Sequence, residues 1–162
     1  MTKIKANEVL KLVISLLICQ LAGIIGSFFT RPSIPTWYAT LGKPLFTPPN
    51  WLFAPVWVAL FAMMGVSLFL VVRKNLKNAQ VKLALGIFGV QLILNIVWSM
   101  VFFGLRSPLA GFIEIIVLWI AILLTIIYFS KLSRAAGLLL IPYFLWVSFA
   151  AILNFSIWRI NM

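Results

Sequence analysis

The side chains that usually do chemistry are scarce in this chain. Its 162 residues include no histidine, one cysteine and only two acids, against thirteen lysines and arginines. A Ser-His-Asp triad and a paired-carboxylate site are therefore excluded, and so is almost every metal site. Aromatic side chains are instead abundant, at 15% of the chain with seven tryptophans. We expect a site that binds by stacking and burial, with no metal ion and no cofactor.

The clearest polar stripe in an apolar segment runs through Gln91, Asn95 and Trp98. Their i, i+4, i+7 spacing puts all three on one face of a helix. Amides are costly in hydrocarbon unless they are paired, so this face should point into the protein. Contact with a neighbouring helix and contact with a ligand explain the stripe equally well.

A second stripe, in the last apolar segment, combines Tyr143, Trp146, Ala150 and Asn154. Aromatic stripes usually indicate a packed interface. Here a small residue and an amide on the same face make room for a guest, so these four residues are candidate ligand contacts.

Two further residues stand out by chemical type alone. Glu114 is the only acid inside an apolar segment, which makes it a candidate ligand contact. An ion pair with Arg106 is equally compatible with its position. Cys19 is the single cysteine, and a small buried hydrophobe is its expected role.

Five apolar segments must position these residues. With 64% hydrophobic residues and a mean hydropathy of +1.17, the chain is too apolar for a soluble domain. Each segment is long enough for a helix to cross a ~30 Å hydrocarbon core, where only helices or closed barrels satisfy the backbone. We predict an all-α membrane protein with a single domain, residues 1–162, and a bundle of five transmembrane helices at about 9–29, 51–72, 81–103, 109–129 and 138–158.

Residues 30–50, between the first two segments, are rich in proline. Pro48 and Pro49 fix their own φ and bias the preceding residue toward extended backbone, so no helix runs through them. Asn50 then favours a helix N-cap, with Trp51 in the first turn. The unusual residues of several helices fall at the depth of this loop, which predicts a lid, with Trp37 at its mouth, over a pocket.

Trp51 and Trp146 lie on different helices at compatible depths. We expect them to form two aromatic walls around a flat apolar guest. A metal-free tetrapyrrole or a sterol-sized molecule suits such walls better than a charged metabolite does.

Taken together, the motifs resemble those of the translocator protein family, also called TspO/MBR or the peripheral-type benzodiazepine receptor family, in its bacterial form. The resemblance extends over nearly the whole chain. Its motifs are Trp37-Tyr38, Lys43-Pro44, Pro48-Pro49 with Trp51, Pro55-Val56-Trp57, Gln91-Leu92 with Asn95 and Trp98, Phe102-Phe103-Gly104, Pro142-Tyr143, Trp146, Ala150, Leu153-Asn154 and Trp158-Arg159.

The resemblance implies five transmembrane helices, frequent homodimers and a pocket closed by the loop after the first helix. It implies binding of porphyrins and of benzodiazepine-type ligands, with cholesterol bound in animal members. In some bacterial members it implies light-dependent breakdown of protoporphyrin, in which case Trp51 and Trp146 would be the catalytic residues. Position-matching assigns to the pocket Trp51, Gln91, Asn95, Trp146, Ala150 and Asn154.

One motif departs from the family. The Leu…Tyr…Arg cholesterol pattern of animal members stands here as Leu153…Phe155…Arg159, without the tyrosine. This departure weakens the case for high-affinity sterol binding.

Three functions remain open at this point. A protein that binds or senses a tetrapyrrole fits the absence of acid–base chemistry. Light-driven porphyrin oxidation is permitted by the tryptophans. Transport of a small solute is the weakest alternative, because the segments show no inverted repeat and no sign of a broken helix.

The basic residues predict the orientation in the cell membrane. They are scattered between the spans and not gathered on one soluble face, which argues against nucleic-acid binding. Nine would lie on the side of the N-terminus and four on the other side, so the positive-inside rule predicts a cytoplasmic N-terminus and an external C-terminus. In intact cells, external protease should remove a C-terminal tag and spare an N-terminal one. The reverse pattern of cleavage would contradict the prediction.

Overall fold

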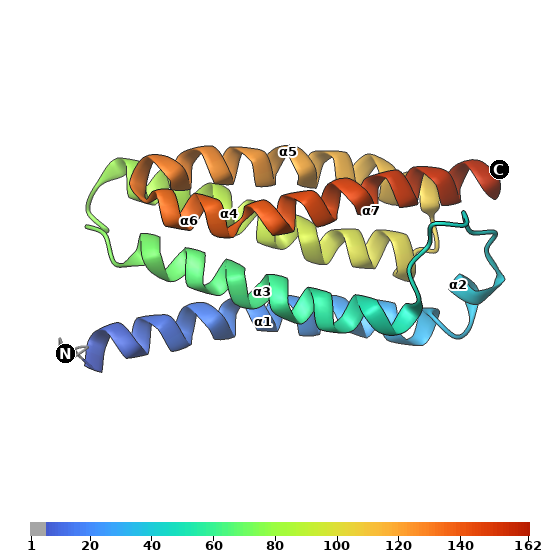
Figure 1. The fold of residues 1–162 in the computed structure, drawn as a ribbon, viewed down its shortest axis with the longest axis horizontal. Helices are drawn as coiled ribbons and strands as arrows, with labels where there is room; N and C mark the ends of the chain where they lie inside the picture. The colour runs from blue at the N-terminus through green and yellow to red at the C-terminus, as the bar shows by residue number, and fades with distance from the viewer. Residues whose placement is uncertain (1–5) are drawn as a thin grey trace.

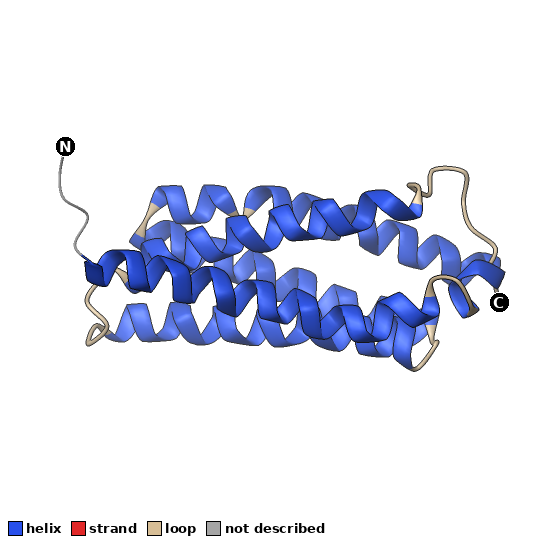
Figure 2. Cartoon of the chain, turned by 90° about the horizontal axis from the view of Figure 1, so that it is seen from below, coloured by secondary structure: helices blue, strands red, loops and turns tan. Residues whose placement is uncertain are grey.

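The computed structural model describes residues 6–162, which form an elongated bundle of helices (Figure 1). The long helices are α1 (Ala6–Ser33), α3 (Asn50–Val72), α4 (Ala79–Ser99), α5 (Pro108–Leu132) and α7 (Ile141–Ile160). The short ones are α2 (Trp37–Thr40), the π-helical turn η1 (Met100–Gly104) and α6 (Arg134–Leu139). No strand occurs within residues 6–162, and the loops lie at the two ends of the bundle (Figure 2).

Five stretches of this described chain are long and apolar enough to cross a membrane. The third joins α4 to η1, and the fifth joins α6 to α7. Apolar side chains such as Leu17 and Phe28 are exposed on the outside, whereas amides such as Gln91 and Asn154 are buried. This inside-out polarity is what lipid requires of a bundle. The predicted all-α fold with five spans is confirmed.

Helix boundaries differ from the predicted ones where proline is involved. α1 continues beyond residue 29 to Ser33 and includes Pro32 in its last turn. α3 begins at Asn50, but the cap position before it is held by Pro49, in extended backbone with φ −61° and ψ 143°. The expected N-cap role of Asn50 is therefore wrong, because the extended proline itself provides the entry and leaves the Asn50 side chain free.

The fifth span is interrupted, although its sequence suggests one unbroken helix over 138–158. α6 ends at Leu139, Leu140 forms the junction, and Pro142 lies in the first turn of α7. Proline has no N–H to donate to the carbonyl of Leu138, so the helical ladder stops there. In the first turn of a new helix the missing N–H costs nothing, which is why α7 starts at this point.

This junction decides how the bundle packs. α1 packs against α3 and α4, and α5 packs against α4, α6 and α7. α3 packs along α6 but meets α7 at few positions, and the two helices diverge toward the end that carries α2 (Figure 1). The buried apolar residues accordingly form two clusters, a large one that includes Met64 and Phe129 and a small one around Tyr38 and Phe102.

At the end opposite α2, polar contacts join the helices. The Glu8 carboxylate lies 2.6 Å from Arg73 Nε, which links α1 to α3, and 3.2 Å from Lys11 Nζ. Ser67 Oγ donates to the carbonyl of Ala136 at 2.7 Å and links α3 to α6. Lys3 and Lys5, which contribute to the predicted charge bias, lie outside the described residues.

Replacing Gly65 with alanine should destabilise the bundle. A Cβ at this position of α3 would lie 2.8 Å from the Cα of Leu16 in α1, so the two backbones would have to separate. Overpacking of this kind costs about 1–3 kcal/mol. We expect a melting temperature in detergent several degrees below that of the wild type.

Gly86→Ala is the matched control, because no described atom lies within 4 Å of a Cβ built at that position of α4. This variant should melt at or slightly above the wild-type temperature, since alanine favours helix. Equal melting temperatures for the two variants would contradict the close packing of α1 on α3.

Candidate functional site

A cavity of about 470 Å³ lies where α3 and α7 diverge. Its volume falls in the ~300–1,000 Å³ range of small-molecule sites. α1, α3, the junction of α4 with η1, and α7 supply its walls, and Ile34 and Tyr38 close the lid end. Residues of both apolar clusters line it, so the cavity lies between the two clusters.

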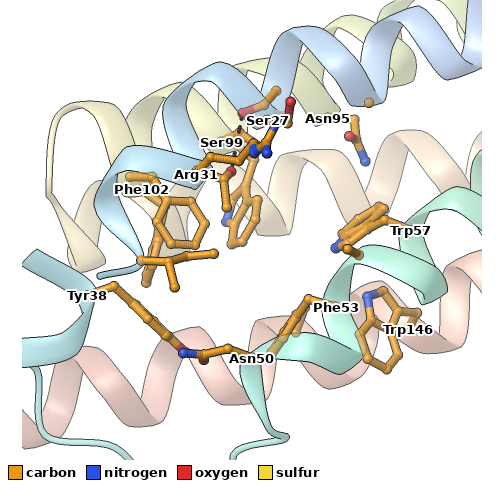
Figure 3. A pocket seen from close by; sticks show the side chains of 18 of the residues that line it. Ser27, Arg31, Tyr38, Asn50, Phe53, Trp57, Asn95, Ser99, Phe102 and Trp146 are labelled. Carbon is orange, nitrogen blue, oxygen red and sulfur yellow. Dashed lines mark hydrogen bonds between the residues drawn. The ribbon is translucent and has the colours of Figure 1, made fainter. Parts of the chain in front are cut away.

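Aromatic rings make up much of the lining (Figure 3). Trp146 packs edge-on against Phe53, with ring centroids 5.9 Å apart and an interplanar angle of 68°. Trp98 stacks on Phe102 at 5.3 Å and 19°. Trp57 lies on the same side of the view as Trp146, and Figure 3 shows both facing the open space. Such a lining offers several ring faces to a flat guest.

The α3 contribution follows a single helical stripe. Its members recur at spacings of three and four, as expected for one face. They are Asn50, Phe53, Ala54, Trp57, Val58 and Phe61.

Trp51 falls outside this stripe. It follows Asn50 by one residue, which turns it by about 100° on the helix. Its side chain is 73% exposed and does not line the cavity. Trp51 and Trp146 therefore do not line the cavity together in this structure, and Trp57 is the α3 tryptophan that lines it.

Five of the candidate ligand contacts do line the cavity. They are Asn95, Trp98, Trp146, Ala150 and Asn154. Two of them also hold helices together: Trp98 Nε1 donates to Asn154 Oδ1 at 3.2 Å, and Asn154 Nδ2 donates to the carbonyl of Pro108 at 2.8 Å. These bonds fix the amide and the indole in place in the cavity wall.

Gln91 and Tyr143 are buried behind the wall and do not line the cavity. Asn95 Nδ2 donates to the Tyr143 hydroxyl at 2.9 Å, and that hydroxyl donates to Gln91 Oε1 at 3.0 Å. The three residues therefore form a hydrogen-bonded chain between α4 and α7. Contact with a neighbouring helix is therefore found for this stripe, and contact of Asn95 with a ligand stays a prediction, since Asn95 also lines the cavity.

Glu114 does not line the cavity either. Its carboxylate oxygens are buried and have no hydrogen-bond partner within residues 6–162. The ion pairs of the described chain are those of Glu8, so the alternative of a Glu114–Arg106 pair is not realised here. Arg106 lies in the turn after η1 with φ of 53°, the left-handed region.

The lid is packed and anchored. Tyr38 is buried against Phe103, and Trp37 packs edge-on against Phe102 at 5.6 Å. Burial raises the pKa of the Tyr38 phenol, so it stays neutral and can donate a hydrogen bond at any physiological pH. Pro48 and Pro49 do not line the cavity but set the extended entry into α3.

A reciprocal amide pair ties the lid to the end of α7. The N–H of Gly42 donates to Asn161 Oδ1 at 2.9 Å, and Asn161 Nδ2 donates to the carbonyl of Gly42 at 2.9 Å. A Cβ at Gly42 would lie 2.6 Å from the side chain of Ile160, so this close approach requires glycine.

Sequence reasoning misses several lining residues. Ser27 belongs to a stripe of small and polar residues on α1, which by its spacing indicates helix packing rather than a ligand contact. Arg31 follows Ser27 by four residues and continues the same face of α1, but it lies beyond the predicted end of that helix at residue 29, and Tyr38 lies in the lid. Asn50, Phe53 and Trp57 are spaced three and four residues apart, and this spacing predicts that they share one face of α3.

Comparison with known proteins now gives the family. The family model described as TspO/MBR matches residues 15–159, nearly the whole chain. The chain belongs to the TspO/MBR family. This confirms the resemblance inferred from the motifs.

Relatives in the TspO/MBR family cover almost the full length. The protein named Tryptophan-rich protein TspO of Chlorobaculum tepidum is 46% identical over 155 residues, which are 96% of this chain and 98% of the relative. Its namesake from Archaeoglobus fulgidus is 48% identical over 155 residues, 95% and 99% of the two chains. The human protein named Translocator protein is 35% identical over 144 residues, 88% and 85% of the two.

Replacing Tyr143 with phenylalanine should lower the stability of this TspO/MBR protein with little effect on the cavity surface. The change removes both hydrogen bonds of the hydroxyl and leaves Asn95 Nδ2 and Gln91 Oε1 without their partner. We expect a loss of about 1–2 kcal/mol, measured as a lower melting temperature in detergent.

Tyr128→Phe is the control, since that ring is half-buried on α5 with Lys131 Nζ 5.0 Å from its centroid. It should melt close to the wild type. A Tyr143→Phe protein as stable as this control would show that the buried chain of hydrogen bonds contributes nothing.

Proposed function

We propose that this protein binds a planar, largely apolar tetrapyrrole such as protoporphyrin in the lidded cavity, as a membrane translocator or sensor. The observation that carries the proposal is the cavity itself, about 470 Å³ between diverging helices, with ring faces from α3, α4 and α7. A flat guest gains stacking and apolar burial against several of these faces at once.

The polar groups of the cavity suit such a guest. Trp146 Nε1 is buried and finds no acceptor within residues 6–162, so it is free to donate to a guest atom. Asn95 and Asn154 are held by their helix contacts and add fixed dipoles. A mostly apolar lining with a few oriented polar groups gives both affinity and a preferred orientation. Benzodiazepine-type compounds, which are also flat and aromatic, suit the same walls.

The names of the relatives agree with this proposal. The human relative is called a translocator protein, and another relative is called a tryptophan-rich sensory protein. The interruption of the fifth span at Leu140 removes one of the two arguments against a transport role, but the cavity lies at one end of the bundle and, within residues 6–162, is no continuous passage between α6 and the lid. We therefore keep binding with translocation or sensing as the proposed function.

A second candidate function is light-dependent oxidation of the bound porphyrin, with dioxygen as the oxidant. Indole is the most easily oxidised side chain of this cavity, and Trp57 and Trp146 both line it. In this proposal they replace the pair that the sequence suggests, since Trp51 faces outward.

The membrane arrangement belongs to the same proposal. We place the protein in the cell membrane with the N-terminus in the cytoplasm, so that the lid faces outward. We also propose a homodimer; Gly86 and Gly89 on α4 have no described atom within 4 Å of a built Cβ, which leaves that face open to a second copy.

Replacing Trp146 or Trp57 with alanine should weaken protoporphyrin binding. Each change removes one ring face and its buried area, about 1.5–3 kcal/mol, or roughly tenfold to a hundredfold in Kd. Replacement with phenylalanine should retain most of the affinity and abolish any light-dependent decay. The measurements are quenching of tryptophan fluorescence during titration, and pigment absorbance in light and in darkness.

Trp51→Ala serves as the control, because it removes a tryptophan of α3 that lies outside the cavity. Its affinity should match that of the wild type. If Trp51→Ala weakened binding while Trp57→Ala and Trp146→Ala did not, the ligand would bind elsewhere.

A further inference from the structure

One charged side chain lines the cavity. Arg31 is the only lysine, arginine or acid among the lining residues of the described chain. The two acids of the whole sequence, Glu8 and Glu114, lie outside this lining. The cavity therefore carries one permanent positive charge and no negative charge to balance it.

The protein does not use this charge elsewhere. Within residues 6–162 the ion pairs join Glu8 to Lys11 and Arg73, and none involves Arg31. Figure 3 shows Arg31 beside Ser27 and Ser99, on the wall formed by α1 and α4. Its guanidinium is thus available to a guest.

The position of Arg31 divides the cavity into two chemical regions. Arg31 is in the last turn of α1, next to the lid, and its side chain is exposed. A long cationic side chain at the end of a spanning helix can extend its charge to the membrane surface, so the charge is kept there at low cost. Trp57 and Trp146 lie further along the cavity, where the lining is aromatic and uncharged and Asn95 adds an amide (Figure 3). A guest that matches both regions has a flat apolar body and an ionised edge.

We propose that Arg31 is a carboxylate-recognition site, so that the cavity selects amphipathic planar acids over their neutral analogues. The proposal rests on the proposed function and names the class of its ligand. A guanidinium presents parallel N–H donors that match the two oxygens of a carboxylate. The guest would place its macrocycle against the tryptophans and its propionate at the lid end.

A purely structural role for Arg31 makes a different prediction. A cation in the last turn of a helix interacts favourably with the helix dipole, which stabilises α1 whatever the guest. In that case removal of the charge would change the melting temperature, and it would affect charged and neutral guests equally. The charge of the guest therefore separates the two roles.

The experiment compares protoporphyrin with its dimethyl ester, which has the same macrocycle and no ionisable carboxyl. Both are titrated into the detergent-solubilised full-length protein, with quenching of tryptophan fluorescence as the readout. The wild type should bind the free acid about tenfold more tightly than the ester, the effect of one charge-assisted contact. Arg31→Gln should weaken binding of the acid about tenfold and that of the ester less than twofold.

Two further variants complete the series. Arg31→Lys keeps the charge and loses the fork of donors, so it should restore part of the preference for the acid. Arg159→Gln removes an exposed arginine from the last turn of α7. Arg159 does not line the cavity, so this variant should leave both affinities unchanged.

Equal affinity of the wild type for acid and ester would overturn the inference and leave the tetrapyrrole proposal standing. Equal weakening of both pigments by Arg31→Gln would overturn it as well. If neither pigment binds the wild type, the proposed function fails and the inference fails with it. The comparison of acid with ester in the wild type needs no variant, so equal affinities would overturn the inference even if Arg31→Gln does not fold.

Discussion

The missing N–H of Pro142 is the constraint on which the cavity depends. A continuous fifth helix would need that donor for the carbonyl of Leu138, and without it the ladder stops at Leu140. The segment before the junction can then pack against α3, while the segment after it packs against α5 and leaves α3. Neighbouring helices in a membrane bundle tend to pack together, so other contacts must keep α7 from packing along α3.

Buried polar pairs supply these contacts. The hydroxyl of Tyr143 joins Asn95 and Gln91 of α4 to α7 just beyond the junction, and Asn154 joins Trp98 to the start of α5. In the hydrocarbon core no water competes for these donors and acceptors. The pairs therefore persist and fix the spacing of the helices they join. The same residues are visible in the sequence as costly exceptions. Their cost is offset because they hold α7 against α4 and the start of α5.

The sequence predicts the fold well because the membrane imposes it. Length and apolarity alone identify the five spans, and the stripes of α4 and α7 identify Asn95, Trp98, Trp146 and others as inward-facing. The structure is needed where a shift of one residue along a helix decides whether a side chain faces the cavity. Trp51 and Asn50 are neighbours in the sequence, yet only Asn50 reaches the cavity, since the start of α3 sets the phase and Pro49 sets that start. Arg31 continues the spacing of Gly23 and Ser27, but a helix predicted to end at residue 29 stops short of it, and only the structure shows that α1 runs on to Ser33.

The hydrogen bonds between Gly42 and Asn161 connect the position of the lid to the position of α7. α7 supplies a wall of the cavity through Trp146 and Ala150. Asn161, which directly follows α7, forms hydrogen bonds with Gly42 of the lid. Both bonds are 2.9 Å long, and a hydrogen bond of this kind is lost once its atoms separate by about half an ångström to one ångström more. A guest that displaces α7 even slightly would thus break the two hydrogen bonds between Gly42 and Asn161. Occupancy of the cavity and exposure of the surface around Gly42 are therefore coupled through the position of α7.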